Sequence, residues 1–457
     1  MKITKNRSAR SMAVDILNRI EEKGAFAEPL LNACLMRDDI MNISDRRLLT
    51  QIVYGTLRMR GRLDWIICQL YRGNFNLMET GIKNILRTAL YQIWFTERIP
   101  DFAIVDEAVK MAKNMHPAGS GLINAILRNA IRKKDEIVYP DIAKDPALHT
   151  STFHSHPLWL VKWWLETFGV EETATICRTN NEVPPYTLRI NRLKTTQEQV
   201  AEEMSHSGFD VKTTAFSPDG LVISHPAVPL RETVFYKSGY IHVQDEASQL
   251  IACLVDPKPG EVILDICSGA GGKATHLAEI MGNRGRIVAL DINKVKIESL
   301  RENAKRQGVD ILDAWRGDAA EDRGEEFHEA FDRILIDAPC SGTGTLRRNP
   351  EIKWRSSSAD IKKMVLLQRA ILKKAALYLK KGGRLIYSTC SMLPAENEEV
   401  VKDFISRHND FVLARPPVTI HPLLTDKQGY FKTFPHRHNM DGFFGAVFVK
   451  ESDRKGK

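Results

Sequence analysis

The hydrophobic pattern of the chain changes twice along its length. Up to about residue 135, apolar residues recur every three or four positions, most clearly over 13–20, 48–57 and 82–95. This spacing places the apolar side chains on one face of a helix, so it predicts an all-helical first part. Ser44 and Asp45 precede the second of these segments and have the side chains that cap helix N termini.

The second pattern begins after a segment, 133–157, that carries three prolines and weak periodicity and is therefore predicted to be a linker. A tryptophan-rich segment follows and predicts a helix. Short apolar segments then alternate with one amphipathic segment, which predicts strands over 186–191, 209–213 and 221–223 and a helix over 196–207. Together these elements predict a small α+β module.

From about residue 246, apolar strands alternate with helices. The predicted strands cover 262–265, 286–290, 333–336 and 384–387, and the predicted helices cover 273–281, 294–306 and 361–379. This alternation is typical of a parallel sheet with helices on both faces. We expect a ligand in the crevice at the carboxyl ends of the strands.

Composition narrows the class of protein. The 457 residues are 43% hydrophobic and 27% charged, which excludes collagen-like, mostly disordered and disulfide-framework proteins. The seven cysteines are widely spaced, so neither a CxxC zinc site nor a dense disulfide pattern is expected. The start of the chain has no apolar core of a secretory signal, and no apolar stretch of about 18 residues exists. We therefore expect a cytoplasmic protein without a membrane partner or a metal.

The formal net charge of +8 is unevenly distributed. Lysine and arginine exceed the acidic residues in the first 150 and the last 117 or so residues, whereas the middle of the chain is acidic. A polyanionic partner such as RNA would contact the two ends most strongly.

A glycine-rich loop follows the first strand of the last region. Gly269, Gly271 and Gly272 allow backbone angles that other residues disfavour, and they let a ligand approach the chain. The next strand ends in Asp291, whose carboxylate can accept both hydroxyl hydrogens of a ribose. The loop therefore predicts a nucleoside cofactor.

Two other nucleotide-binding motifs share part of their pattern with this loop. A phosphate-binding P-loop would need glycine where Cys267 stands and serine or threonine where Ala274 stands, so it is disfavoured. The strict GxGxxG motif also fails at Ala274, but its looser GxGxxA form is present. The loop alone thus leaves an NAD-dependent enzyme open.

Two cysteines, Cys340 and Cys390, each stand just beyond an apolar strand of the same predicted sheet. A thiolate that adds to carbon 6 of a pyrimidine makes carbon 5 nucleophilic enough to accept a methyl group from S-adenosylmethionine. A second thiol can remove the carbon 5 proton, and Asp337 is placed to stabilise ring N3. The pair therefore predicts covalent pyrimidine methylation, and Cys267 is interpreted as part of the cofactor wall.

At these residues the sequence resembles the RNA cytosine-C5 methyltransferases, and more narrowly the RsmB (Fmu/Sun) family. The motifs of the second half are VQDEASQL (243–250), DAPCSGTGTLRRNPEIKW (337–354), YSTCSMLPAENEEVV (387–401) and DGFFGAVFVK (441–450). Those of the first half are SDRRLLTQIVYGTLR (44–58), AIVDEAVKMAK (103–113) and GLINAILRN (121–129). The resemblance covers nearly the whole chain.

The resemblance implies a multidomain fold. It predicts an all-α NusB-like RNA-binding domain over 1–140, a small ferredoxin/RRM-like α+β domain over 150–245, and an α/β Rossmann-like catalytic domain over 246–453. The implied reaction transfers a methyl group from S-adenosylmethionine to carbon 5 of a cytosine in 16S rRNA. The implied partner is 16S rRNA or pre-subunit RNA, and we expect a monomer.

The resemblance also assigns residues. Cys390, in the TCS motif, is the expected nucleophile, and Cys340, in the PC motif, is the expected release cysteine, with Asp337 as the third catalytic residue. The expected cofactor-binding residues are Cys267, Ser268, Gly269, Ala270, Gly271, Gly272, Lys273, Asp291, Asp318 and Asp337. The loop usually has the sequence CAAPGGK in the family, whereas this chain has CSGAGGK.

Other hypotheses stay open at this point. The substrate could be tRNA or another RNA, and a thiol-using NAD-dependent oxidoreductase or a non-catalytic RNA-binding factor are more remote alternatives. A basic segment after Cys340 carries one aromatic residue, Trp354, between Lys353 and Arg355. It is interpreted either as a loop that contacts RNA or as a solvated charged loop.

Overall fold

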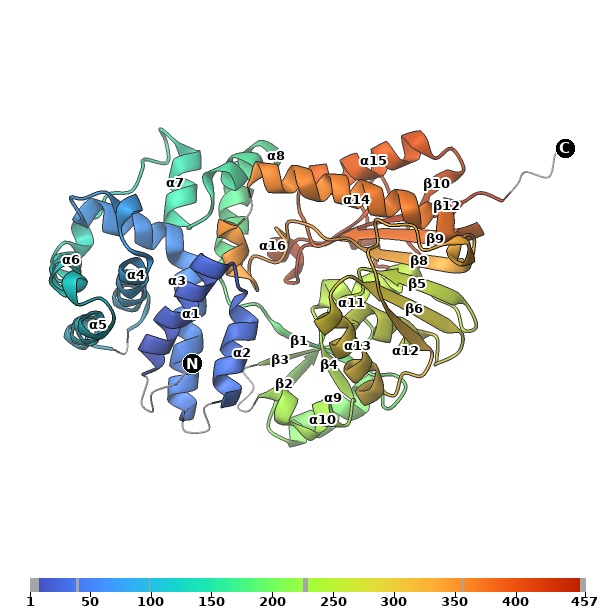
Figure 1. Cartoon of the computed structure of the whole chain (residues 1–457), viewed down its shortest axis with the longest axis horizontal. Coiled ribbons are helices and arrows are strands. Elements are labelled where there is room, and N and C mark those ends of the chain that lie inside the picture. Colours follow the sequence, from blue (N-terminus) through green and yellow to red (C-terminus); the bar gives the residue numbers. More distant parts are fainter. Residues whose placement is uncertain (1–7, 38–40, 98, 225–228, 356, 453–457) are drawn as a thin grey trace. The chain divides into compact units, whose positions relative to one another are not determined.

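A computed structural model describes residues 8–37, 41–97, 99–224, 229–355 and 357–452 of the chain (Figure 1). It divides into two compact units, Met1–Glu182 with Leu346–Arg355 (unit 1) and Val183–Thr345 with Ser356–Lys457 (unit 2). Each unit has its own hydrophobic cores. The first residues of the predicted domain 1–140 and the last residue of 246–453 lie outside the described residues.

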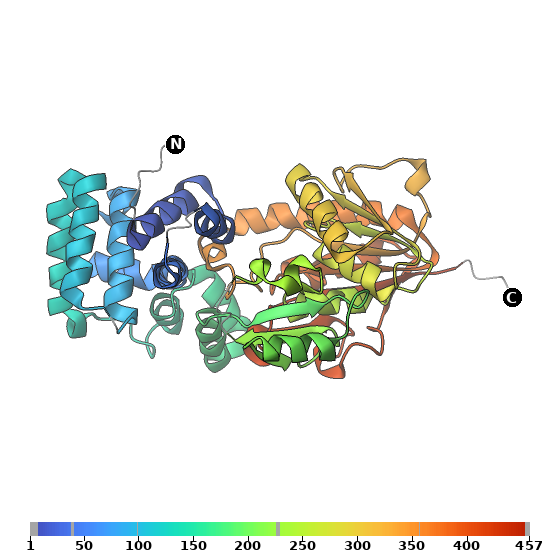
Figure 2. The ribbon, with the colours of Figure 1, turned by 90° about the horizontal axis from the view of Figure 1, so that it is seen from below.

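Unit 1 is helical throughout its described residues (Figure 2). Its helices are α1 (Ala9–Lys23), α2 (Ala27–Arg37), α3 (Ile43–Leu70), α4 (Thr80–Phe95), α5 (Asp101–Met115), α6 (Ser120–Arg132), α7 (Pro146–Phe153) and α8 (Leu158–Asn180). The all-α prediction is confirmed. The predicted cap is wrong by two residues, because Asn42 accepts the hydrogen bond from the backbone N–H of Asp45 at 2.8 Å.

The predicted linker contains α7. Asp145 caps this helix by accepting a hydrogen bond from the backbone N–H of Leu148, and Pro146 takes the first helical position, which suits its fixed φ. Pro146 therefore begins a helix, and Pro157 directly precedes α8. The tryptophan-rich helix α8, predicted as part of the small α+β module, belongs to unit 1, where Trp164 is fully buried.

The basic segment after Cys340 is also part of unit 1. Its short 3-10 helix, η6 (Pro350–Trp354), places Lys353 in the interior with 2% of its surface exposed. The Lys353 ammonium donates to Asn181 Oδ1 at 2.6 Å and to the backbone carbonyls of Arg58 and Ser155. Trp354 Nε1 donates to a carbonyl of α3. Burial shows that both sequence interpretations, RNA contact and solvated loop, are wrong for Lys353, whereas Trp354 is half-buried.

Unit 2 begins with a four-stranded antiparallel sheet. Its strands are β1 (Tyr186–Ile190), β2 (Asp210–Thr213), β3 (Gly220–Ser224) and β4 (Ile241–Val243), in the order β2-β3-β1-β4. Helix α9 (Gln197–His206) packs on this sheet and starts with a capping box between Thr196 and Gln199. The predicted α+β module is present; the sequence analysis missed β4 and the short helix α10 (Val234–Lys237).

The second sheet of unit 2 is mixed. Five parallel strands lie in the order β9-β8-β5-β6-β7, with bounds β5 (Val262–Ile266), β6 (Arg286–Asp291), β7 (Leu312–Arg316), β8 (Phe331–Asp337) and β9 (Leu379–Thr389). Antiparallel strands extend it beyond β9, namely β10 (Phe411–Ala414), β11 (Phe431–Lys432) and β12 (Phe444–Lys450). The prediction of an all-parallel sheet is therefore wrong at this edge, because strand direction is set by pairing and not by local pattern.

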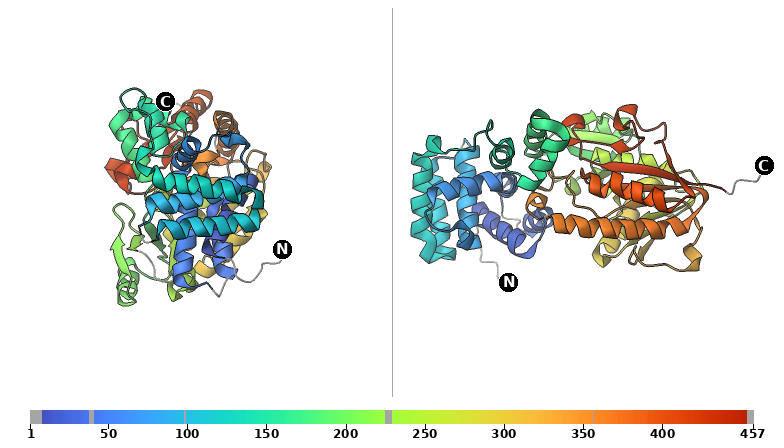
Figure 3. Two further views of the ribbon diagram at one scale, coloured as in Figure 1. Left: turned by 90° about the vertical axis from the view of Figure 1, so that its left-hand side faces the viewer. Right: turned by 90° about the horizontal axis from the view of Figure 1, so that it is seen from above.

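Helices cover both faces of the large sheet (Figures 1 and 3). One face packs against α14 (Ser358–Tyr378) and α15 (Glu398–Arg407), and the other against α11 (Glu246–Val255), α12 (Gly272–Ile280) and α13 (Lys294–Gln307). Successive strand residues alternate between the two cores, as Ile263 and Leu264 show. The α/β class is confirmed. No helix among the described residues is long and apolar enough to cross a membrane.

Candidate active site

The candidate site lies along one edge of the large sheet. Because β5 to β9 run parallel, their carboxyl ends meet at this edge. Each of these ends leads into one of the predicted functional segments: the loop 267–273, Asp291, Asp318, Asp337 with Cys340, and Cys390. All of them belong to unit 2.

The loop between β5 and α12 turns through residues with positive φ. Cys267 (φ 63°), Gly269 (φ 59°) and Gly271 (φ 86°) all adopt the left-handed region. At Gly271 a side chain would also collide with Leu300, whose Cγ lies 2.7 Å from the position of a Cβ. At Gly269 nothing lies within 4 Å of that position, so the loop is open on this side.

Asp291 and Asp318 hold backbone groups at the same edge. Asp291 Oδ2 accepts from the backbone N–H of Gly269 at 2.9 Å, and its Oδ1 accepts from that of Asn293 at 2.8 Å. Asp318 Oδ1 accepts from the backbone N–H of Ala320 at 2.9 Å. Asp291 thus braces the glycine loop, a role that the sequence pattern did not reveal.

Lys273 and Asp337 form an ion pair between the first turn of α12 and the end of β8. The Lys273 Nζ to Asp337 Oδ2 distance is 2.6 Å, and Asp337 Oδ1 accepts from Ser388 Oγ at 3.2 Å. Burial lowers the pKa of Lys273, but Asp337, Asp265 and Cys390 together raise it above its usual value. Lys273 is therefore a cation in contact with the site's acidic groups.

Asp265, near the end of β5, is a buried acid that the sequence analysis did not select. Burial raises the pKa of its carboxyl to about 8, and Asp337 adds to the rise. Among the residues that the structure describes, neither carboxyl oxygen of Asp265 has a hydrogen-bond partner, and Ser268 Oγ in the loop has none either. Orphaned polar atoms beside an open glycine loop are what a site for a polar nucleoside cofactor requires, so these residues fit S-adenosylmethionine.

Cys340 and Cys390 meet at the same edge. Their Sγ atoms are 3.2 Å apart, and both thiols are free and half-buried. The hydrogen bond with Cys390 and then burial raise the pKa of Cys340 well above that of an ordinary thiol. The structure brings together the two cysteines that sequence position selected. Cys267 lies in the loop, and burial raises its thiol pKa as well, which suits a wall residue.

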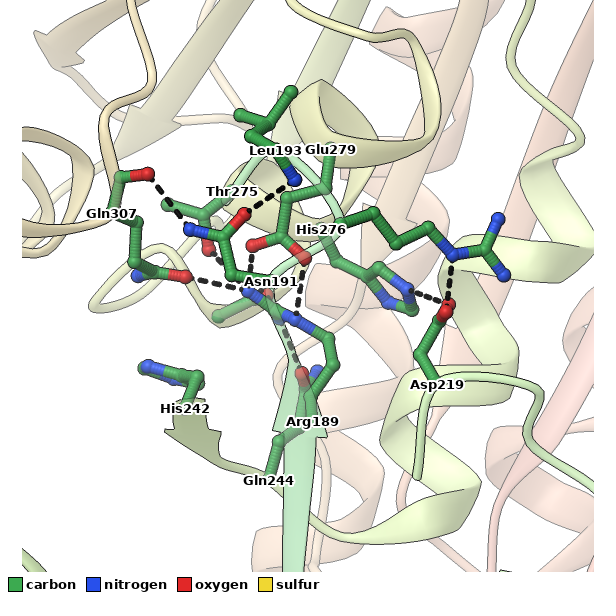
Figure 4. A network of polar contacts seen from close by, with 12 residues as sticks. Arg189, Asn191, Leu193, Asp219, His242, Gln244, Thr275, His276, Glu279 and Gln307 are labelled. Atoms are coloured by element: carbon green, nitrogen blue, oxygen red, sulfur yellow. Dashed lines mark hydrogen bonds and ion pairs between the residues drawn. The ribbon is translucent and has the colours of Figure 1, made fainter. Parts of the chain in front are cut away.

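A buried polar network supports the helix that follows the loop (Figure 4). Arg189 of β1 is fully buried and donates to Glu279 and Thr275 of α12 and to the carbonyl oxygen of Gly272. Gln244 and Gln307 accept its remaining hydrogen bonds. An isolated arginine within an apolar strand, in the sequence YTLRIN, is the only local sign of this network.

Within the residues that the structure describes, no group of three or more histidine, cysteine and acidic side chains is arranged to hold a metal ion.

Comparison with known families matches three consecutive parts of the chain. The model described as "16S rRNA methyltransferase RsmB/F" matches residues 252–449. The NusB family model matches residues 7–132, and the ferredoxin-like domain of RsmF/B-like methyltransferases matches residues 156–230.

Similar proteins cover almost the entire chain. A Bacillus subtilis protein named "Probable ribosomal RNA small subunit methyltransferase B" is 35% identical over 447 residues, which are 96% of this chain and 98% of that protein. The ribosomal RNA small subunit methyltransferase B of Serratia proteamaculans is 32% identical, with 97% of this chain and 99% of that protein covered.

Solved structures show the same architecture. The crystal structure of the protein PH0851 has a TM-score of 0.84 at 28% identity and covers 97% of this chain and 99% of its own. A methyltransferase homologue from Pyrococcus horikoshii has a TM-score of 0.58 at 27% identity and covers 67% of this chain and 99% of its own. With a NusB-type domain, a ferredoxin-like domain and a matching methyltransferase domain in this order, the chain belongs to the RsmB family of S-adenosylmethionine-dependent ribosomal RNA methyltransferases.

Proposed function

We propose that this protein methylates carbon 5 of a cytosine in 16S rRNA. The observation that carries the proposal is the 3.2 Å separation of the Cys340 and Cys390 sulfurs at the sheet edge that also holds the glycine loop. A second thiol beside a nucleophilic thiol is what carbon 5 methylation needs, because one sulfur must attack the ring and another group must later remove a proton.

Cys390 is the proposed nucleophile. Its thiolate forms a bond with carbon 6, and the electron pair of the ring double bond moves to carbon 5. Lys273 supports this step as a nearby cation, since Cys390 is one of the groups that raise the pKa of the Lys273 ammonium. S-adenosylmethionine, when bound, supplies an electrophilic methyl group for carbon 5.

Cys340 is the proposed base that ends the reaction. Its thiolate accepts the carbon 5 proton, the ring double bond re-forms, and the bond between Cys390 sulfur and carbon 6 breaks. In the free protein the pKa of Cys340 is held up mainly by the hydrogen bond with Cys390. Once Cys390 is bonded to carbon 6, that interaction is lost, so formation of the adduct itself prepares Cys340 to act as a base.

Asp337 is the proposed contact of the pyrimidine ring edge, together with the ammonium of Lys273. Asp337 can accept from the cytosine amino group, and the Lys273 donor, 2.6 Å from its Oδ2, can stabilise charge that develops on the ring during the attack. Asp337 Oδ1 is held by Ser388, which fixes the orientation of the carboxyl group.

The cofactor would be held by Cys267 to Lys273 with Asp291 and Asp318. The open side of Gly269 gives it room, the backbone N–H groups at the start of α12 offer hydrogen bonds, and Asp291 is placed to accept from ribose hydroxyl groups. The NusB-type domain of unit 1 is the proposed RNA-binding part of the chain.

Methyl transfer tests the proposal directly. The full chain should transfer radiolabelled methyl groups to a 16S rRNA transcript, and bisulfite sequencing should place the product on a single cytosine. Transcripts of tRNA and 23S rRNA are parallel substrates. Labelling of tRNA in place of 16S rRNA would overturn the target, and incorporation into no RNA would overturn the activity.

The two cysteine variants test the roles. With RNA and cofactor, Cys340→Ala should accumulate a protein–RNA adduct that survives denaturation, because it forms the bond to carbon 6 but cannot release it. Cys390→Ala should form no adduct. The opposite pattern would exchange the two roles, and Cys68→Ala, an exposed thiol of α3, serves as a control substitution outside the site.

A further inference from the structure

A buried carboxylate lies between the two cysteine loops. Glu396 belongs to the 3-10 helix η7 (Pro394–Glu396) and has no exposed surface. Its sequence context, AENEEVV, is a run of acidic residues that would ordinarily predict a solvated helix start. Nothing in the proposed methyl transfer uses this side chain.

Glu396 accepts hydrogen bonds from both loops. On the Cys340 side, Ser341 donates its backbone N–H to Oε1 at 2.8 Å and its hydroxyl to Oε2 at 2.5 Å. On the Cys390 side, Ser391 donates its hydroxyl to Oε2 at 2.6 Å. The two serines directly follow the two cysteines, so one carboxylate joins the residues next to both sulfurs.

Further contacts fix Glu396 itself. Gln368 of α14 donates to Oε1 at 3.2 Å and also to the carbonyl oxygen of Pro339, the residue before Cys340. Tyr387, near the end of β9, donates its hydroxyl to the backbone carbonyl of Glu396 at 2.6 Å. The carboxylate is therefore held from the helix, from the strand and from both loops.

We propose that Glu396 is a positioning residue that sets the separation of Cys340 and Cys390 by clamping Ser341 to Ser391. The proposal rests on the proposed methyl transfer for its catalytic consequence. The physical reason is that a buried carboxylate must keep all its donors, since each lost hydrogen bond leaves a costly unsatisfied charge. The two loops thus cannot separate without leaving the buried Glu396 carboxylate short of hydrogen-bond donors.

The clamp also has an electrostatic consequence that can be measured without RNA. The negative charge of Glu396 is one of the causes that raise the pKa of the Cys340 thiol. The hydrogen bond with Cys390, burial and the charge of Cys390 are the larger causes. Removing the charge while keeping the shape should lower that pKa. A residue that only stabilised the fold would not shift the titration of one particular thiol.

Glu396→Gln is the decisive variant, with Glu399→Gln as its matched control, because Glu399 is exposed three residues later in the same chain segment. Alkylation of Cys340 by iodoacetamide, followed by mass spectrometry as a function of pH, should show a midpoint about one pH unit lower in Glu396→Gln. The Glu399→Gln midpoint should equal that of the unmodified protein. An unchanged midpoint in Glu396→Gln would overturn the electrostatic part of the proposal.

Kinetics test the positioning part. In Glu396→Gln, kcat should fall about 100-fold, because misplacement of a reacting group by about 1 Å costs that much. The KM for S-adenosylmethionine should stay within about twofold, because none of the clamp's contacts involves the cofactor loop. A kcat within twofold of the unmodified protein would overturn the clamp.

Two milder variants keep the test decisive if Glu396→Gln does not fold. Ser341→Ala and Ser391→Ala each remove one hydroxyl donor and should each lower kcat with an unchanged cofactor KM. Full activity in both would overturn the clamp. If the unmodified protein methylated no RNA, the proposed function would fail, while the Cys340 alkylation profile would still decide whether Glu396 controls that thiol.

Discussion

Arg189 and Glu279 form an ion pair in which both side chains are fully buried, with Arg189 Nη2 2.7 Å from Glu279 Oε1. The pair joins β1 of the small sheet to α12, the helix that starts directly after the glycine loop. Arg189 also donates to the carbonyl oxygen of Gly272 at the start of that helix. The ferredoxin-like part of unit 2 thus holds the first turns of the helix that follows the glycine loop.

Arg189→Met should destabilise unit 2 by about 3–5 kcal/mol, because it leaves the Glu279 carboxylate buried without its cation. The double variant Arg189→Met/Glu279→Leu should recover much of that loss, since no charge is then stranded. The urea dependence of amide hydrogen exchange in peptides from β1 and α12 measures the free energy of unfolding of each variant. Equal losses in the single and double variants would show that the unpaired Glu279 carboxylate is not the cause of the destabilisation.

The stability of unit 2 should depend on pH through His276. Burial and the charge of Arg189 lower the pKa of His276 to about 4, although Asp219 accepts its hydrogen bond at 3.1 Å. In the unfolded chain a histidine titrates near pH 6.5, so between about pH 6.5 and 4 the unfolded state binds more protons than the folded state. The free energy of unfolding should therefore fall with decreasing pH in this window, by about 1.4 kcal/mol per unit from this one group.

His276→Gln isolates that contribution. The difference between the unmodified protein and the variant should grow as the pH is lowered from 6.5 and level off below about 4. His206→Gln is the matched control because His206 is exposed. If the free energy of unfolding depended on pH with the same slope in all three proteins, the assignment to His276 would be wrong.

The glycine loop offers a matched pair of substitutions. Gly269→Ala adds a methyl group to open space and costs only the strain of a positive φ, about 1 kcal/mol. Gly271→Ala adds the same strain and a collision with Leu300 of α13. Calorimetric titration with S-adenosylhomocysteine should show near-normal affinity in the first variant and a loss of at least about tenfold in the second.

Gly269 is one of three positions, with Ser268 and Ala270, at which this loop differs from the usual CAAPGGK, which has alanine at the position of Gly269. Tolerance of Gly269→Ala would mean that the departure leaves the turn intact. If Gly269→Ala instead bound as weakly as Gly271→Ala, the open space beside Gly269 would have to be occupied by the cofactor itself.

Lys273→Met should weaken cofactor binding and slow methyl transfer. The substitution leaves Asp337 without its cation and removes a charge that lowers the pKa of Asp265, so the acidic groups of the site lose their counter-ion. A loss of about 10- to 100-fold in affinity for S-adenosylhomocysteine is expected for a charged hydrogen bond of this kind. Lys305→Met, an exposed lysine of α13, is the control and should bind normally.

The sequence predicted those site residues that lie at the ends of parallel strands. Cys340, Cys390 and Asp337 each come just after an apolar run, and parallel strands bring such positions to one edge, so their proximity followed from the pattern. Glu396 could not be found in this way, because a single sequence does not distinguish a buried acid in an acidic run from a solvated one. The burial of Glu396 depends on its hydrogen-bond donors, and one of them, Ser341, lies 55 residues away in the sequence.

The fold shows the same limit. Helix periodicity and apolar strands are local features, and they located α1, α3, α4 and α8 of unit 1 and four of the five parallel strands of unit 2. Strand β7 was not predicted, and α7 lies in the predicted linker. The direction of β12, paired antiparallel to β9, and the burial of Lys353 in unit 1 depend on long-range pairing. The charge of a segment did not predict its exposure, because the basic segment that was predicted to face RNA or solvent contains the buried Lys353.

The burial of Lys353 gives opposite expectations for stability and for RNA binding. Lys353→Met would leave Asn181 Oδ1 and two backbone carbonyls without their donor, at a cost of about 1–3 kcal/mol for each unsatisfied buried group. Because the ammonium does not face solvent, the dependence of RNA affinity on salt should not change. A lysine that contacted phosphate would lower the slope of log K against log salt by about 0.7–0.9.

Hydrogen exchange of peptides from α3 and α8 should therefore show faster opening of unit 1 in Lys353→Met, while the salt slope of rRNA binding stays at that of the unmodified protein. Lys362→Met, at the start of α14 in unit 2, is the matched control for hydrogen exchange and should leave unit 1 unchanged. A reduced salt slope with unaltered exchange in Lys353→Met would mean that this side chain leaves the interior to bind RNA, because only an ammonium in contact with phosphate releases counterions on binding.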